Sequence, residues 1–278
     1  MTDDPIKFFT RFSLRLCVFA SSLVWLFTPA AEAAFDHSHA QWDTLAKKHV
    51  VWLPGGNASQ SDYRGFQADH AALKTYLAQL SAVTQAEYDG WSKPQQLAFL
   101  INAYNAFTVE LILTGYPKLK SIKDLGSLTR SPWKKNFFTL FGKSRHLDDI
   151  EQGMIRAAGV FDEPRIHMAV NCASVGCPAL RNEAFVAGKL DAQLEDGVER
   201  FLSDASRNRF NPQSGKLEIS KIFDWYGKDF AGKAGSEAAW LAKYAERLAS
   251  DTSARQSIRD RKVKLTFLDY DWSLNDKR

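Results

Sequence analysis

The longest apolar stretch outside the first residues runs from Leu97 to Leu113 and contains a single charged residue. A helix with apolar side chains on nearly every face is expected to be buried, so this stretch predicts a central helix of the domain. Ser92 and Gln95 have the spacing of a capping box, and Pro94 is tolerated in the first helical turn. The helix is expected to end at Gly115-Tyr116-Pro117.

Amphipathic patterns on both sides of this stretch predict further elements. Two short runs around Gly142 predict a hairpin with glycine leading its turn, and Leu217–Ile219 predicts a short strand. No internal repeat and no linker rich in Gly, Pro or Ser is present. We expect an α+β fold: a mostly helical single domain around a buried central helix, with a small antiparallel sheet. The other predicted helices cover residues 35–49, 63–80, 148–158, 190–201 and 236–248, and one starts at Pro178 or soon after.

The first 33 residues have the pattern of a secretory signal peptide. Three basic residues precede an apolar run at 16–27, and the small-residue site Ala31-Glu32-Ala33 follows. The run is too short to span a bilayer comfortably. We therefore expect cleavage near Ala33, a periplasmic or secreted protein, and no transmembrane segment in the mature chain. The predicted organisation is a signal peptide at 1–33, an N-terminal helical region at 34–89 and the main domain at 90–278.

Composition narrows the class of protein. Hydrophobic residues make up 45% of the chain and charged residues 24%, as in ordinary soluble domains, and the net charge of +4 indicates no particular partner. The sequence contains no glycine-rich phosphate loop, no Gly-x-Ser-x-Gly motif and no paired metal-ligand histidines in the mature part. These absences argue against nucleotide enzymes, common serine hydrolases and zinc peptidases. No motif supports nucleic-acid binding.

The candidate chemistry lies in the segment 164–180, PRIHMAVNCASVGCPAL, called the central stretch below. Its first half alternates between apolar and polar positions, which favours a half-buried strand, and a short helix starting at Pro164 is the competing interpretation. In either case His167 and Asn171 share a face, because four residues are two strand repeats or about one helical turn. Cys172 points elsewhere.

Cys177 stands immediately before a proline, where a helix is expected to begin. Unpaired N–H groups and the helix dipole would stabilise a thiolate there and lower its pKa. The sequence thus suggests a catalytic group in which Cys177 is the nucleophile and His167 the base. Asn171 or an asparagine of the central helix would orient that base.

Other pairings of the same residues stay open. Cys172 and Cys177 are the only cysteines after the signal segment, so in an exported protein they are expected to form a disulfide, or else to be free thiols. Zinc would need three or four ligands, and only His167 could join the two cysteines. No metal or other cofactor is therefore expected.

Supporting roles are predicted for four further residues. Asn102 and Asn105 lie on one stripe of the central helix and need hydrogen-bond partners if buried. They either satisfy core backbone groups or hold the central stretch in place. His146 and Glu151 resemble an acid/base cluster, but charged residues at a helix start usually act as caps and dipole partners.

Five motifs taken in order resemble the family called domain of unknown function 547. The resemblance covers the chain from about residue 90 to its end and implies a fold unit without an activity. The motifs are LAFLINAYNA (97–106), LDDIEQGMIR (147–156), IHMAVNCASVGCPAL (166–180), FDWYGKDF (223–230) and YDWSLN (270–275).

Two functions are consistent with these residues. One is a thiol-dependent hydrolase or acyl transferase that acts on amide or ester bonds. The alternative is a non-catalytic envelope binding or assembly domain with a Cys172–Cys177 disulfide. The expected partner is a small molecule, a peptide or an envelope polymer.

Overall fold

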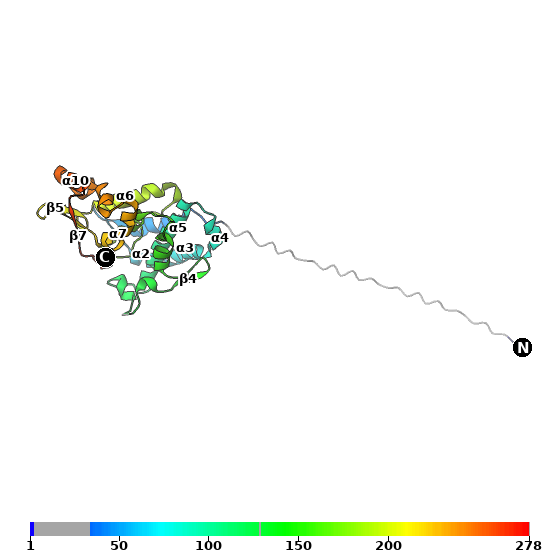
Figure 1. Cartoon of the computed structure of the whole chain (residues 1–278). Coiled ribbons are helices and arrows are strands. Elements are labelled where there is room, and N and C mark those ends of the chain that lie inside the picture. The colour runs from blue at the N-terminus through cyan, green and yellow to red at the C-terminus, as the bar shows by residue number, and fades with distance from the viewer. Residues whose placement is uncertain (3–33, 128, 278) are drawn as a thin grey trace. The chain divides into compact units, whose positions relative to one another are not determined.

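The structure, a computed structural model, describes residues 1–2, 34–127 and 129–277 of the chain. The chain divides into two compact units, Met1–Ala34 and Phe35–Arg278. All described helices and strands belong to the second unit (Figure 1). The predicted signal peptide falls almost entirely on residues 3–33, outside the described part.

The N-terminal region contains the helices α1 to α4, and its longest predicted helix is broken. Residues 63–80 form two helices, α2 (Tyr63–Ala68) and α3 (His70–Ala82). Asp69 separates them, and its carboxylate binds Lys48 Nζ (2.6 Å) and His49 Nε2 (2.7 Å). The apolar spacing continues through the break and therefore conceals it. The other elements of this region are α1 (Ala40–His49), β1 (Val50–Trp52), β2 (Ser59–Ser61) and α4 (Gln85–Asp89).

The central helix is confirmed as α5 (Lys93–Leu113). It begins with the predicted capping box: the Ser92 backbone N–H donates to Gln95 Oε1 (3.0 Å), and Pro94 lies in the first turn. Among the described residues, α5 is the one helix long and apolar enough to cross a membrane. However, 94% of its most apolar 18-residue stretch is buried inside the protein, so α5 is a core helix.

The hairpin around Gly142 is also confirmed. β3 (Phe138–Leu140) pairs antiparallel with β4 (Lys143–Arg145). The prediction that glycine leads the turn is wrong, because Phe141 comes first and Gly142 second, with φ of 54° and 69°. A two-residue turn with positive φ at both positions matches the twist of the strands, and Gly142 adopts it at no steric cost.

Short helical segments connect α5 to the C-terminal region. The predicted helix at 148–158 is a shorter π-helical segment, η3 (Asp149–Ile155), and the central stretch begins with the 3₁₀ helix η4 (Pro164–Met168). The strand interpretation of residues 166–171 is therefore wrong and the competing helical one is correct. The remaining segments are η1 (Ile122–Leu125), η2 (Pro132–Lys134) and η5 (Ala187–Lys189).

The C-terminal region contains α6 (Leu190–Leu202), as predicted, and two helices that the pattern did not predict. These are α7 (Lys221–Ala234) and α10 (Thr252–Arg259). A kink at Tyr226 (φ −116°) interrupts α7, so its apolar residues do not follow one helical period. The helix predicted at 236–248 is two helices, α8 (Glu237–Ala242) and α9 (Ala245–Leu248).

A three-stranded sheet completes this region. β5 (Arg209–Asn211) pairs antiparallel with β6 (Lys216–Ile219), and β6 pairs parallel with β7 (Lys264–Phe267). The small sheet predicted as antiparallel thus contains one parallel pair. Parallel neighbours require a long crossover, which α7 to α10 provide. The α+β class is confirmed.

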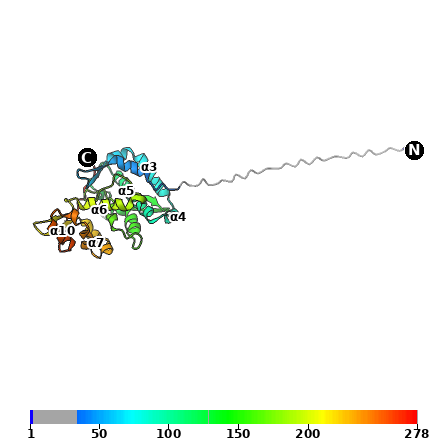
Figure 2. The same ribbon diagram turned by 90° about the horizontal axis from the view of Figure 1, so that it is seen from above.

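Two buried apolar clusters hold these elements together. The first core surrounds α5 and includes residues of α1 to α4 and η3. The second core is formed by α6 to α10 and β6. η4 contributes Ile166 to the first core and Met168 to the second, so the central stretch lies where the two meet. In the two views α5 is surrounded by other helices and α10 lies at the edge of the unit (Figures 1 and 2).

Candidate functional site

A cavity of about 260 Å³ opens at this boundary. Tyr104 of α5 and Val170 of the central stretch line it from the first core. Ile222 and Tyr226 of α7 line it from the side of the second core. His167, Cys172 and Cys177 line the same cavity, together with Glu151 of η3. Four of the eight sequence-predicted residues therefore meet in this cavity, whereas Asn171, Asn102, Asn105 and His146 are not among its lining residues.

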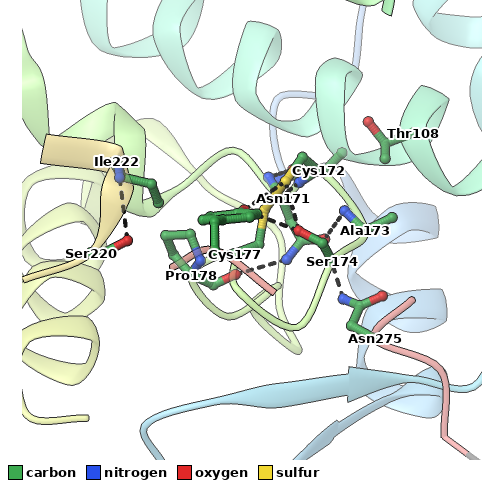
Figure 3. The surroundings of a disulfide bond; sticks show 12 residues. Thr108, Asn171, Cys172, Ala173, Ser174, Cys177, Pro178, Ser220, Ile222 and Asn275 are labelled. Carbon is green, nitrogen blue, oxygen red and sulfur yellow. Dashed lines mark hydrogen bonds between the residues drawn. A yellow bond between two sulfur atoms is a disulfide. The ribbon is translucent and has the colours of Figure 1, made fainter. Parts of the chain in front are cut away.

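The two cysteines are joined by a disulfide, with their Cα atoms 6.2 Å apart (Figure 3). The backbone N–H of Cys172 donates to Cys177 Sγ (2.8 Å). Cys172 Sγ lies 3.2 Å from Ser174 Oγ and 3.1 Å from Tyr270 Oη. A bridge over so few residues stabilises the fold by only about 2 kcal/mol in the chain-entropy model, so its main effect is to shape this wall of the cavity.

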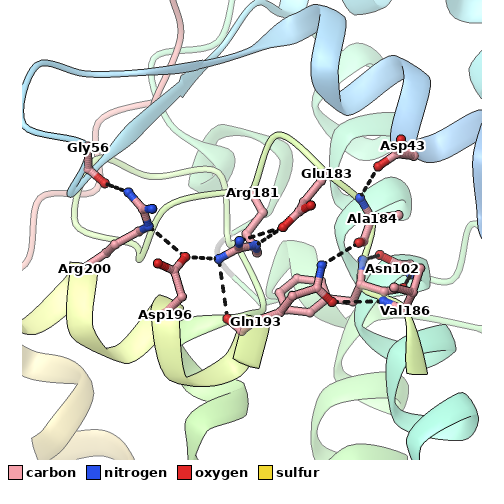
Figure 4. Close-up of polar contacts among 11 residues, drawn as sticks. Asp43, Gly56, Asn102, Arg181, Glu183, Ala184, Val186, Gln193, Asp196 and Arg200 are labelled. Atoms are coloured by element: carbon pink, nitrogen blue, oxygen red, sulfur yellow. Dashed lines mark hydrogen bonds and ion pairs between the residues drawn. The ribbon is translucent and has the colours of Figure 1, made fainter. Parts of the chain in front are cut away.

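The prediction that Cys177 stands at a helix N-terminus is wrong, because no helix begins at Pro178. Side chains bind the backbone that follows the disulfide, in place of helical hydrogen bonds; Figure 4 shows those near Ala184, where the N–H of Ala184 donates to Asp43 (3.0 Å). Asn171 Nδ2 donates to the carbonyl of Pro178 (2.7 Å), and Gln193 Nε2 donates to the carbonyl of Ala184 (2.8 Å). The thiolate stabilisation expected from a helix start is therefore absent.

The prediction that Asn102 and Asn105 are buried is confirmed, since their exposed fractions are 0% and 2%. Asn102 accepts from the N–H of Phe185 (2.9 Å) and donates to its carbonyl (2.7 Å). Asn105 accepts from the N–H of Asn171 (2.8 Å) and donates to the carbonyl of Ala169 (3.0 Å). Each carboxamide thus pairs with backbone groups, Asn105 within the central stretch and Asn102 in the loop after it.

His167 has a partner that sequence reasoning did not identify. Its Nε2 hydrogen-bonds Asp229 Oδ2 of α7 (2.8 Å), and its ring stacks on Tyr226 with centroids 3.9 Å apart. Arg156 donates to both oxygens of the same carboxylate (2.6 and 2.9 Å). Asp229 belongs to the FDWYGKDF motif, but nothing local in the sequence connects it with a histidine 62 residues away.

Burial and hydrogen bonding set the charges of this group. Burial lowers the pKa of His167, and the bond to Asp229 opposes this only in part, so the imidazole is neutral near pH 7. Burial raises the pKa of Asp229, but hydrogen bonds from His167 and Arg156 outweigh it and hold that pKa well below its usual range. The ionised carboxylate accepts a hydrogen bond from Nε2–H, which leaves Nδ1 as the basic nitrogen of His167.

Two acidic side chains, Asp148 and Glu151, line the cavity and are called the acidic pair below. Glu151 is only 5% exposed, and Tyr226 Oη donates to its Oε1 (2.7 Å). Burial and the charge of Glu151 raise the pKa of Asp148.

His146, the other member of the predicted acid/base cluster, forms a reciprocal cap with Asp149. The backbone N–H of His146 donates to Asp149 Oδ2 (3.0 Å), and its Nδ1 accepts the N–H of Asp149 (3.0 Å). The predicted cap contact of His146 is therefore present.

Four aromatic side chains form the aromatic wall of the cavity: Trp133, Trp225, Tyr270 and Trp272. Ring centroids are 4.9 Å apart for Trp225 and Tyr270, 4.5 Å for Tyr270 and Trp272, and 5.8 Å for Trp133 and Trp272. Sequence reasoning did not assign these rings to the site. The aromatic clusters FDWY and YDW were the available signal.

The metal hypothesis finds no support in the geometry. In the part of the chain that the structure describes, no group of three or more His, Cys, Asp or Glu side chains is arranged to hold a metal ion. Both sulfur atoms are also engaged in the disulfide.

Fold and site together define a mostly helical α+β domain with an aromatic and acidic cavity beside a disulfide. Residues 88–202 match the model of the family described as "Protein of unknown function, DUF547", so the family recognised from the motifs is confirmed over this range. The motifs at 223–230 and 270–275 lie beyond the matched residues. No curated protein and no solved structure matches the chain.

Proposed function

We propose that this chain is an exported, non-catalytic binding domain that holds a small ligand in the cavity between its two cores. The observation that carries the proposal is the aromatic wall, since ligand pockets are typically lined by apolar and aromatic side chains with a few converging polar groups. The disulfide would fix one side of the pocket. His167, whose Nε2 is engaged by Asp229, would fix another.

Export is part of this proposal and rests on the signal-like pattern of residues 1–33. N-terminal sequencing of the protein from the periplasmic or secreted fraction tests it. A mature chain that begins near Ala34 is expected. An intact Met1 in the membrane fraction would contradict export as a cleaved protein.

The binding function is tested by ligand-observed NMR on the disulfide-bonded protein with three probes: indole, neohexanol and choline. At least one probe should receive saturation from the wild-type protein and lose it in Trp225→Ala, because Trp225 lines the cavity and its exposure of 43% lets the variant fold. Trp52→Ala is the matched control, since Trp52 packs against Arg200 outside the cavity. Absence of saturation for all three probes, or equal signals in both variants, would contradict the proposal.

A thiol-dependent hydrolase or acyl transferase is the second candidate, because His167 and both cysteines line one cavity. It requires that the bridge open first, since a bonded sulfur is not a nucleophile. Thiol counting by intact mass establishes the starting state. The enzyme hypothesis predicts that the protein hydrolyses a p-nitrophenyl ester only after mild reduction, and that the Cys177→Ser variant loses this activity. A reduced protein without activity would leave binding as the function.

A further inference from the structure

We propose that the ligand is a small organic cation with an ammonium head, held between the acidic pair and the aromatic wall. This inference rests on the proposed binding function and adds the chemical class of the ligand. Its basis is the charge of the cavity together with the kind of side chain that surrounds the acids.

The cavity is negative. Asp148 and Glu151 line it, and among its described lining residues there is no lysine or arginine. Two arginines near this site have carboxylate partners that do not line the cavity: Arg156, which also lies over the Tyr226 ring (4.7 Å), binds Asp229, and Arg207 forms an ion pair with Asp204 (2.8 Å). His167 adds no positive charge because burial lowers its pKa. An anionic ligand inside the cavity would therefore meet two carboxylates and no basic side chain among the described lining residues.

A bound cation would stabilise the ionised form of the acidic pair. Glu151 is 5% exposed and accepts from Tyr226 and Gln152, both neutral donors. Burial and the charge of Glu151 raise the pKa of Asp148, and the charge of Asp149 adds to this rise. The positive charges of Lys134 and His146 lower that pKa and offset part of the rise. Placing a positive charge beside two partly desolvated carboxylates removes this repulsion.

The aromatic wall provides a second kind of contact for an ammonium group. The faces of tryptophan and tyrosine rings carry negative potential, and cages of such rings with an acid bind ammonium groups in preference to neutral groups of the same shape. Trp272 already holds one ammonium in this way, because Lys123 Nζ lies 3.7 Å from its ring centroid. Trp225 is 43% exposed, so an incoming group can reach it.

The volume of about 260 Å³ limits the ligand. It is close to the lower end of ligand pockets, which span roughly 300 to 1,000 Å³. A small head group fits such a space, whereas a folded segment of another protein does not. The ammonium head can belong to a quaternary amine of the choline type or to a primary amine of the lysine type, and the experiment separates these sources.

The test is isothermal titration of the disulfide-bonded protein with choline, butylammonium and neohexanol, the neutral carbon isostere of choline. We expect at least one of the two cations to bind at least about tenfold more tightly than neohexanol. A preference for choline identifies a quaternary head, and a preference for butylammonium identifies a primary amine. Asp148→Asn should weaken the preferred cation by about fivefold and leave neohexanol unchanged.

Asp191→Asn is the matched control, because it removes one carboxylate whose side chain is 90% exposed and paired with Arg165 outside the cavity. Trp225→Ala should weaken the cation about threefold or more. Equal binding of neohexanol and both cations would overturn this inference and leave the binding function standing. No binding of any probe would overturn both. Equal effects of Asp148→Asn and Asp191→Asn would also contradict a cation held by the acidic pair.

Discussion

The first core and the second core differ in how directly the sequence encodes them. The first is organised by one helix, α5, whose apolar side chains cover nearly every face. The second is assembled from short helices and a small sheet, and isolated helices of such length are marginal in water. A long buried helix carries its own pattern, whereas short elements depend on contacts with one another.

A second division, between the residues that match the family model and those that follow them, runs through the cavity. The residues matched by the family model, 88–202, contain the acidic pair, His167 and the disulfide. Three of the four rings of the aromatic wall, and Asp229, come from beyond residue 202. The matched residues therefore supply the acidic pair and the disulfide, and the later residues supply most of the aromatic wall.

The largest expected effects come from removing an aromatic ring from either core. Phe99 of α5 and Phe223 of α7 are both 0% exposed, so Phe99→Ala and Phe223→Ala should each reduce the free energy of unfolding by about 3 to 5 kcal/mol. Because η4 contributes to both cores, each variant should still unfold in one transition. Urea unfolding followed by fluorescence and circular dichroism measures this. Two separated transitions would show that the cores are independent.

A smaller effect is the loss of folding stability at low pH. Burial, with a further contribution from His37, lowers the pKa of His39 to about 4, and its Nδ1 hydrogen-bonds Tyr76 Oη (2.7 Å). The unfolded chain binds a proton on this histidine near pH 6.5 and the folded chain does not. Stability is therefore complete above pH 6.5 and is lost as pH falls towards 4, by about 3 kcal/mol.

Urea titrations at several pH values check this, with variants as controls. His39→Gln should remove most of the slope between pH 6.5 and 4.5. His167→Gln should remove less, because the bond to Asp229 partly offsets the lowering of the His167 pKa. An unchanged slope in His39→Gln would contradict burial of a neutral His39.

The smallest of these effects tests the contact between α5 and the loop after the central stretch. Asn102→Leu leaves the N–H and the carbonyl of Phe185 without their partner, which should cost about 1 to 3 kcal/mol. Gln79→Leu is the control, as the same kind of exchange at an exposed position of α3. Equal melting temperatures for the two variants would count against the bidentate contact.

Much of the first core followed from the sequence, because helical period, capping box and turn chemistry are local signals. α5, the hairpin at Gly142 and the burial of Asn102 belong to this group. α7 was missed because its kink at Tyr226 breaks the apolar period.

The candidate site was predicted in part. The segment that contains His167 and the two cysteines was identified, and the disulfide was one of the alternatives. The Asp229 contact and the aromatic wall were not predicted, because both depend on how the second core folds against the central stretch. The helix expected at or soon after Pro178 is absent, and side chains far away in the sequence, Asp43 and Asn102, bind the backbone N–H groups of Ala184 and Phe185 in this segment. The catalytic roles of Cys177, His167 and Asn171 stay predictions.

The central claim is that the cavity between the two cores binds an ammonium ligand, and the indole N–H signals of isotope-labelled tryptophan test it most directly. On titration with choline or butylammonium, the signals of Trp225 and Trp272 should shift and saturate together. Trp42, buried in the first core, and Trp240, buried in the second, should not respond. Shifts of all four signals alike, or no shift at Trp225 and Trp272, would contradict the claim.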